Sequence, residues 1–83
     1  MSDIVQFVAL PFDLTDEGLV PGEPFKCATP AAAIERAKGD WMMFGHTGAV
    51  AFVRTIYPER QITVLRKFGS VPRELPECLD ADF

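Results

Sequence analysis

The first part of the chain combines apolar runs with turn residues in the manner of a loose β-hairpin. Residues 4–10 are mainly β-branched, aliphatic or aromatic, and this pattern predicts a strand that Pro11 ends. Pro21-Gly22 is a turn signal, and residues 24–28 after it predict a short second strand. Because prolines adjoin this strand and lack an N–H group, we expect it at an edge of the sheet.

Two longer apolar runs later in the chain predict a second hairpin. Residues 49–57 form the clearest strand of the sequence, and residues 61–68 are its expected partner. We expect Val50–Ile56 to pair with Ile62–Phe68 across a turn at 58–60. The register stays open, because a loop longer by one residue exchanges the cross-strand partners.

Between the two hairpins the sequence predicts one helix over residues 30–44. Thr29 supplies an N-cap hydroxyl, Pro30 suits the first helical position, and the alanine-rich segment that follows has high helix propensity. The apolar spacing continues past Gly39, so we expect the helix to contain this glycine. The residues expected to form the core between helix and sheet are Ile34, Ala37, Trp41, Phe44, Phe7, Phe52 and Val64.

These elements predict an α+β fold with the order ββαββ, or βαββ if the short edge strand does not form. One helix packs on one face of a three- or four-stranded antiparallel sheet. Residues 1–75 are expected to form a single domain, and residues 76–83 an acidic, disordered tail.

Both faces of the predicted strands are apolar, although one helix covers only one face. A second layer is therefore needed, and the second copy in a homodimer is one candidate. The alternative is that residues 11–24 and 71–83 fold back over the sheet. Adjacent methionines at the helix end suit an adaptable contact surface. The residues expected to mediate self-association are Val50, Phe52, Met42 and Met43.

Composition and charge narrow the expected function. The 83 residues hold 8 basic and 12 acidic side chains, a net charge of −4, which opposes general nucleic-acid binding. The apolar run at residues 4–10 is too short for a signal peptide or a membrane span. Two cysteines far apart in sequence, Cys27 and Cys78, are expected to be thiols in a reducing cytoplasm.

The charges are unevenly distributed along the chain. Residues 54–73 hold five basic side chains and one acidic side chain, Glu59. Residues 1–25 and 74–83 carry acidic side chains and no basic ones. One interpretation is a basic hairpin that binds an anionic ligand or RNA through Arg54, Arg66 and Lys67. The other is that the acidic ends screen this charge within the fold.

Groups for catalysis or metal binding are scarce. His46 is the only histidine, the serines lie at positions 2 and 70, and there is no nucleophile elbow. Pairing of Cys27 or Cys78 with His46 is not indicated by the spacing, and the three residues do not make up a zinc site. The glycines at 45 and 48 precede a strand rather than opening a helix. We therefore expect no catalytic residue, cofactor or metal, and interpret His46 as a loop residue at the helix end.

Several segments resemble a family of small, uncharacterised bacterial proteins of about this length. The resemblance rests on Pro21-Gly22-Glu23-Pro24, the alanine-rich helix, Gly48-Ala49-Val50-Ala51-Phe52 with Arg54-Thr55, and Arg66-Lys67-Phe68-Gly69-Ser70-Val71-Pro72. The turn at 56–60 departs from the family by being shorter and more apolar. The resemblance implies a compact α+β domain and implies no activity, cofactor or catalytic residue.

The sequence thus favours a small, non-catalytic, cytoplasmic module that binds another protein and self-associates through its sheet. The alternative is a small domain that binds an anionic ligand or RNA through the basic hairpin.

Overall fold

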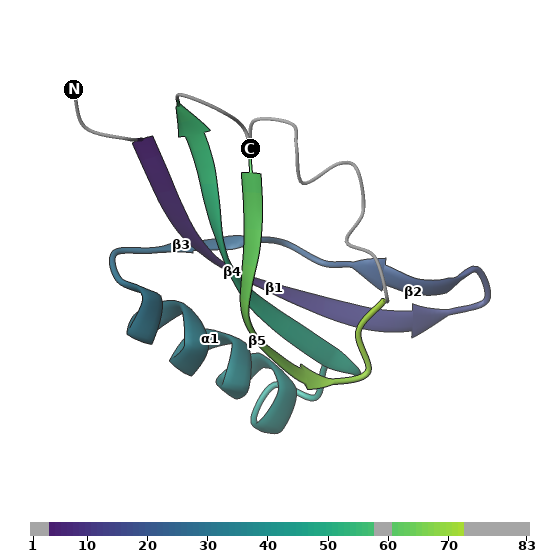
Figure 1. The fold of residues 1–83 in the computed structure, drawn as a ribbon. Coiled ribbons are helices and arrows are strands. Elements are labelled where there is room, and N and C mark those ends of the chain that lie inside the picture. The colour runs from purple at the N-terminus through teal and green to yellow at the C-terminus, as the bar shows by residue number, and fades with distance from the viewer. Residues whose placement is uncertain (1–3, 58–60, 73–83) are drawn as a thin grey trace.

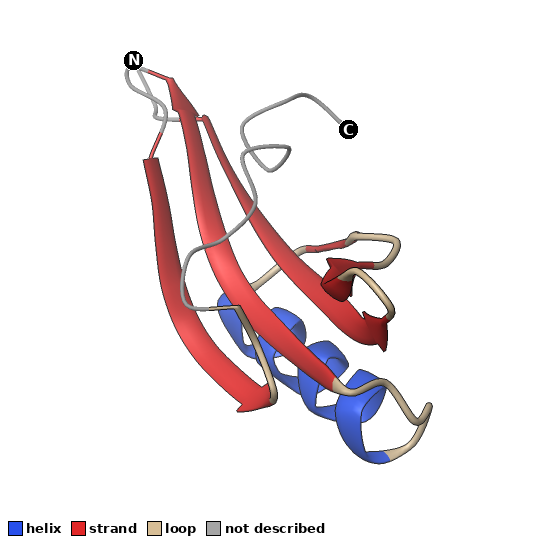
Figure 2. Ribbon diagram, turned by 90° about the vertical axis from the view of Figure 1, so that its right-hand side faces the viewer, coloured by secondary structure: helices blue, strands red, loops and turns tan. Residues whose placement is uncertain are grey.

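The computed structural model describes residues 4–57 and 61–72, which form an antiparallel sheet with one helix on one of its faces (Figures 1 and 2). The predicted α+β fold is confirmed. The order is βββαββ, which has one short strand more than expected before the helix. The elements are β1 (Ile4–Thr15), β2 (Gly18–Pro21), β3 (Phe25–Cys27), α1 (Pro30–Met42), β4 (Gly48–Tyr57) and β5 (Gln61–Gly69).

The strand order is β2-β1-β4-β5, and β3 pairs with the same edge of β1 as β2 does. Thus β2 and β3 form one edge strand with an interruption. The partners Phe12↔Pro21 and Ala9↔Phe25 frame this interruption, so two residues of β1 face three residues, 22–24, of the edge strand. This extra residue makes a local bulge.

The prediction that Pro11 ends the first strand is wrong, because β1 continues to Thr15. The Pro11 carbonyl accepts a hydrogen bond of 2.8 Å from the Gly22 N–H, so this side of Pro11 faces the interrupted edge strand. The N–H that proline lacks would point to the same side, where the bulge disturbs the regular ladder. A proline is tolerated there.

The predicted start of α1 is confirmed, and its predicted end is two residues too late. The Thr29 hydroxyl accepts a hydrogen bond of 3.0 Å from the Ala32 N–H, and Pro30 occupies the first turn. The helix continues through Gly39 and ends at Met42. Gly45 then takes the left-handed conformation (φ 76°) that turns the chain toward β4.

Small side chains make the contact between α1 and the sheet. The buried cluster on this face consists only of alanines, namely Ala9, Ala33, Ala37, Ala49 and Ala51. Methyl groups let the helix backbone lie close to the strands, so larger residues pack only around this contact.

Several residues predicted for the core under α1 lie elsewhere. Ala37 is buried and Ile34 partly buried, as expected, but Trp41 is 40% exposed and Phe44 and Val64 are also exposed. Trp41 instead stacks on Phe68 of β5, with ring centroids 6.0 Å apart. The alanine contact leaves no space for an indole between helix and sheet.

The face of the sheet opposite α1 holds the larger buried side chains. They are Val8, Leu10, Phe12, Val50 and Phe52. Among the described residues, Leu19, Ile62 and Val71 pack against this cluster. The fold-back alternative is therefore the better one for the residues described, and Phe52 belongs to this face rather than to the helix face.

The predicted hairpin of β4 and β5 is confirmed, with a register shift between Ala51 and Phe52. Gly48 and Gly69 are partners where this hairpin meets α1. A Cβ atom on Gly48 would overlap the carbonyl of Ser70, and Gly69 adopts φ 64° directly against the Trp41 indole. Backbone and ring therefore approach closely here because both strands carry glycine.

Two glycines of different surroundings give a first prediction. Gly39→Ala should raise the free energy of unfolding by about 0.5–1 kcal/mol, because Gly39 lies inside the helix and its Cβ would make only an ordinary contact. Gly48→Ala should lower it by about 2 kcal/mol or more, because the backbone of residue 70 must shift. Urea unfolding of both variants measures this. Equal effects of the two substitutions would contradict the close approach at Gly48.

Burial also ranks two aromatic residues. Phe52→Ala should cost about 3–5 kcal/mol, as for a fully buried phenylalanine. Trp41→Ala should cost less, about 1–2 kcal/mol, since only part of the indole is removed from water. Thermal or denaturant unfolding distinguishes the two, and a larger loss for Trp41→Ala would contradict the described packing of α1.

Candidate functional site

The residues predicted to bind anions do not form one surface. Arg54 is 2% exposed, and by strand alternation it lies on the face opposite α1. Arg66 is exposed on the α1 side, where its guanidinium lies 5.7 Å from the Phe68 ring centroid. Lys67 is exposed, and its partner Val50 places it on the other face. Anion binding by these three residues stays a prediction. Arg66 lies on the α1 face and the other two on the opposite face, so the three side chains do not converge on one ligand.

The residues predicted for self-association are separated in a similar way. Val50 and Phe52 are buried within the single chain, so they are not available to a partner as predicted. Met42 and Met43 lie at the end of α1 and are 64% and 80% exposed. Val50 and Phe52 are buried because other residues of the same chain pack on the sheet face opposite α1.

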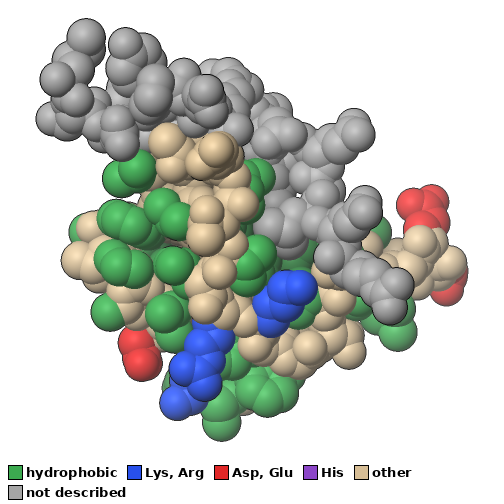
Figure 3. All heavy atoms as spheres, in the orientation of Figure 1, with side chains coloured by type: hydrophobic (Ala, Val, Ile, Leu, Met, Phe, Trp, Pro, Cys, Tyr) green, Lys and Arg blue, Asp and Glu red, His purple; other side chains and the backbone are tan. Residues whose placement is uncertain are grey.

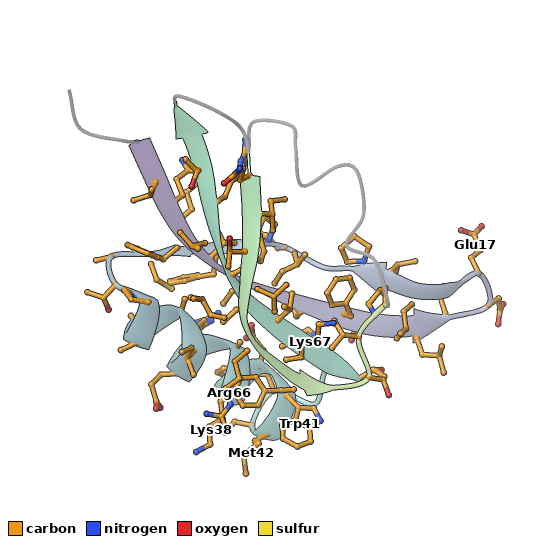
Figure 4. The ribbon with its side chains drawn as sticks, viewed as in Figure 1. Glu17, Lys38, Trp41, Met42, Arg66 and Lys67 are labelled. Atoms are coloured by element: carbon orange, nitrogen blue, oxygen red, sulfur yellow. The ribbon has the colours of Figure 1, made fainter. Side chains whose placement is uncertain are left out.

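Large apolar side chains and cations gather at the end of α1, and we call this the helix-end surface. Its members are Lys38, Trp41, Met42, Met43 and Arg66. Figure 4 shows Lys38, Trp41, Met42 and Arg66 at the same end of the molecule, and Figure 3 shows basic side chains among apolar ones on this face. A shallow groove of about 240 Å³ lies beside Gly39 and is lined by Glu35, Lys38 and the two methionines.

The β1–β2 hairpin carries the opposite charge at its tip. Leu14 is 68% exposed, and Asp16 and Glu17 are exposed beside it. The Thr15 hydroxyl orders the turn, because it donates to the Gly18 carbonyl and accepts from the Glu17 N–H. We call Leu14, Asp16 and Glu17 the acidic tip. Glu17 in Figure 4 lies well away from the helix-end surface.

A cavity of about 400 Å³ opens beneath the bulge of the edge strand, and we call it the edge cavity. Pro11, Pro24 and Phe25 form apolar walls. The polar side chains come from both sides of the gap between edge strand and helix end, and they are Glu23, Arg36, Asp40 and His46. The bulge thus creates the cavity, because it moves Glu23 and Pro24 out of the regular ladder.

Asp40 is the buried charge of the edge cavity. It is 3% exposed on the face of α1 that also holds Ala33 and Ala37. Its Oδ1 lies 3.4 Å from Nε of Arg36, one helical turn earlier. The Arg36 guanidinium lies 4.2 Å from the ring centroid of Phe25 and 5.6 Å from that of Phe44, so aromatic rings hold this cation in place.

His46 lies in the loop after α1, as predicted, and pairs with an aspartate of β1. Its Nδ1 lies 2.9 and 3.2 Å from the two carboxylate oxygens of Asp13. The backbone N–H of His46 also donates to the backbone carbonyl of Asp40, which fixes the loop to the last turn of the helix. The pair therefore orients the imidazole at the rim of the cavity.

Cys27 is a partly buried thiol on β3, close to the helix. Burial raises the pKa of the Cys27 thiol, while the positive charge of Arg36 lowers it and the negative charge of Asp40 raises it. A raised pKa makes the thiolate scarce at neutral pH. Cys78 lies outside the described residues, so a pairing of His46 with Cys78 stays untested. Among the described residues no group of three His, Cys, Asp or Glu side chains is placed to hold a metal ion.

Comparison with models of protein families, with curated proteins and with solved structures found no match. The resemblance to small bacterial proteins therefore stays a prediction. In the part of the chain that the structure describes, no helix has both the length and the apolar character needed to cross a membrane.

Sequence reasoning missed the edge cavity. One signal was present, because Asp40 continues the buried series of Ala33 and Ala37 with a carboxylate. The pairing of Asp13 with His46 joins residues 33 positions apart, and no local pattern indicates it.

The raised pKa of Cys27 predicts slow alkylation. In a Cys78→Ser variant, Cys27 is the single thiol, and its reaction with iodoacetamide should be slower in the folded protein than in urea. The midpoint of the pH profile should lie at higher pH in the folded protein, because burial favours the thiol form. Restricted access alone would slow the reaction without moving this midpoint. A folded midpoint at lower pH would contradict the expectation and indicate an activated thiolate.

Proposed function

We propose that the protein is a non-catalytic module that associates with further copies of itself head to tail. The helix-end surface of one copy binds the acidic tip of the next. The observation that carries this proposal is the opposite charge of two exposed apolar surfaces at separate places on one small domain. Its expected setting is the cytoplasm, where the cysteines remain thiols.

The chemistry of the two surfaces is complementary. Lys38 and Arg66 outnumber Glu35 beside the exposed methionines of one surface, and Asp16 and Glu17 accompany exposed Leu14 on the other. Methionine side chains adapt to the shape of a partner because they are unbranched and flexible. An aliphatic side chain such as Leu14 suits the groove beside Gly39.

Two other ways of self-association have less support. Contact through the sheet face, as the sequence suggested, would require Val50 and Phe52, which are buried in the single chain. A two-fold contact between helix-end surfaces would place Lys38 and Arg66 of one copy near the same cations of the other. A head-to-tail contact brings opposite charges together instead, and such contacts form open chains or closed rings.

The expected association is weak and sensitive to salt. Each exposed charge pair contributes about 0.2–1 kcal/mol, and stable interfaces bury at least about 1,000 Å². Both surfaces are small, so self-association should become visible only at high protein concentration and low ionic strength.

A second candidate function is the binding of an anionic ligand such as single-stranded RNA. The stacked pair of Trp41 and Phe68, with Arg66 over Phe68, favours it, because aromatic stacking beside a cation is a common mode of binding to bases. The net charge of −4 opposes it.

Charge reversal tests the head-to-tail contact. One variant carries Lys38→Glu and Arg66→Glu, and the other carries Asp16→Lys and Glu17→Lys. By light scattering at low salt, the wild-type mass should rise above the monomer mass of 9.2 kDa with concentration. Each variant alone should stay at that mass. An equimolar mixture should regain the rise in mass with concentration, because one variant then offers acidic surfaces and the other basic ones.

Lys67→Glu is the matched control, since it reverses a neighbouring exposed charge on the other face of the sheet and should associate like the wild type. A wild type at monomer mass throughout would overturn the proposal. Variants that associate unchanged, or a mixture that stays at the monomer mass, would also overturn it. A monomer that binds a single-stranded oligonucleotide, and loses this in Trp41→Ala, would favour the second candidate.

A further inference from the structure

The edge cavity contains a buried carboxylate that has one described partner. The Asp40 side chain is 5% exposed, and its only ion pair among the described residues is the 3.4 Å contact with Arg36. No hydrogen bond from the described residues reaches either of its oxygens. Buried carboxylates normally collect several short hydrogen bonds, because a charge removed from water must be compensated. Neither Asp40 oxygen is a fully buried atom without a partner, so the carboxylate opens onto the cavity and can accept hydrogen bonds from a ligand there.

The geometry points to a binding site for a small primary ammonium ion in this cavity, with Asp40 as its principal acceptor. This site is separate from both surfaces of the proposed self-association. An ammonium group offers three N–H donors and a positive charge, and a charge-assisted hydrogen bond to a carboxylate is stronger than a neutral one.

A second carboxylate lines the cavity. Glu23 contributes it from the bulge. His46 also lines the cavity, and its Nδ1 lies 2.9 Å from an oxygen of Asp13. Two carboxylates thus line one cavity, which suits a ligand with several N–H donors.

The charges of the cavity select a cation. Glu23 and Asp40 are the carboxylates that line the cavity, and Arg36 is the one permanent cation among the lining residues. Asp13 adds a carboxylate behind His46. The guanidinium of Arg36 is engaged by Asp40 and lies over the rings of Phe25 and Phe44, so an added anion would meet an excess of carboxylates.

The walls define the rest of the ligand. Pro11, Pro24 and Phe25 are apolar and suit a short hydrocarbon chain. Because Arg36 already lies over the Phe25 ring, the ligand is recognised by hydrogen bonds rather than by an aromatic cage. A cation without N–H groups should therefore bind poorly.

Titration of the full chain with n-butylammonium chloride tests the site. Amide and imidazole NMR signals should shift for residues around the cavity, notably Gly22, Asp40 and His46, and should saturate. Tetramethylammonium chloride and sodium chloride at equal ionic strength should cause no saturable shift at these positions. Sodium acetate should likewise fail to bind, because the cavity disfavours anions.

Asp40→Asn should weaken n-butylammonium binding at least about tenfold, since it removes the charge and keeps the shape. Glu35→Gln removes an acid from the exposed face of the same helix and should leave binding unchanged. Glu23→Gln alters an exposed lining residue and should weaken binding even if Asp40→Asn does not fold.

Equal binding of tetramethylammonium, or unchanged affinity in Glu23→Gln together with Asp40→Asn, would overturn the assignment. Saturable binding of acetate would assign the cavity to anions through Arg36 instead. None of these outcomes depends on the mass of the protein in solution, so the two proposals fail separately.

Discussion

The contact of alanine with alanine between α1 and the sheet determines where the other side chains lie. Ala33 and Ala37 pack against the small side chains of β1 and β4, which brings the helix close to the strands. Trp41 and Phe44 then have no space beneath the helix and lie at its margin. The exposed apolar surface at the helix end is thus a consequence of a close internal contact.

The same close contact places Asp40 beside an irregular edge. Next to Pro11, the edge strand contains an extra residue and leaves the regular ladder, and the space beneath it becomes a cavity. Asp40 follows Ala37 by three residues and therefore points to this space. Arg36 supplies the opposite charge there, and two aromatic rings hold the Arg36 guanidinium in place. Helix register and strand bulge together make the polar site.

The two faces of the sheet are packed with side chains of different size. Small residues pack on the face that α1 covers. Large residues pack on the opposite face, where Leu19, Ile62 and Val71 of the same chain contact them. A strand with two apolar faces does not by itself indicate an oligomer, because neighbouring segments supply a second layer. The surfaces that we propose for self-association lie instead at the ends of elements, where exposed apolar and charged side chains meet.

The sequence by itself determined the elements with local signals. Thr29-Pro30 marks the helix start, and the apolar runs around residues 58–60 mark the hairpin, because capping and strand propensity act over a few residues. It did not determine which face α1 covers, since both faces are apolar, or that β1 passes through Pro11. The tertiary structure alone decided that Arg66 and Lys67 lie on opposite faces and that Asp13 meets His46. Such pairings join residues distant in sequence, so they depend on the register of strands and on the closeness of helix packing.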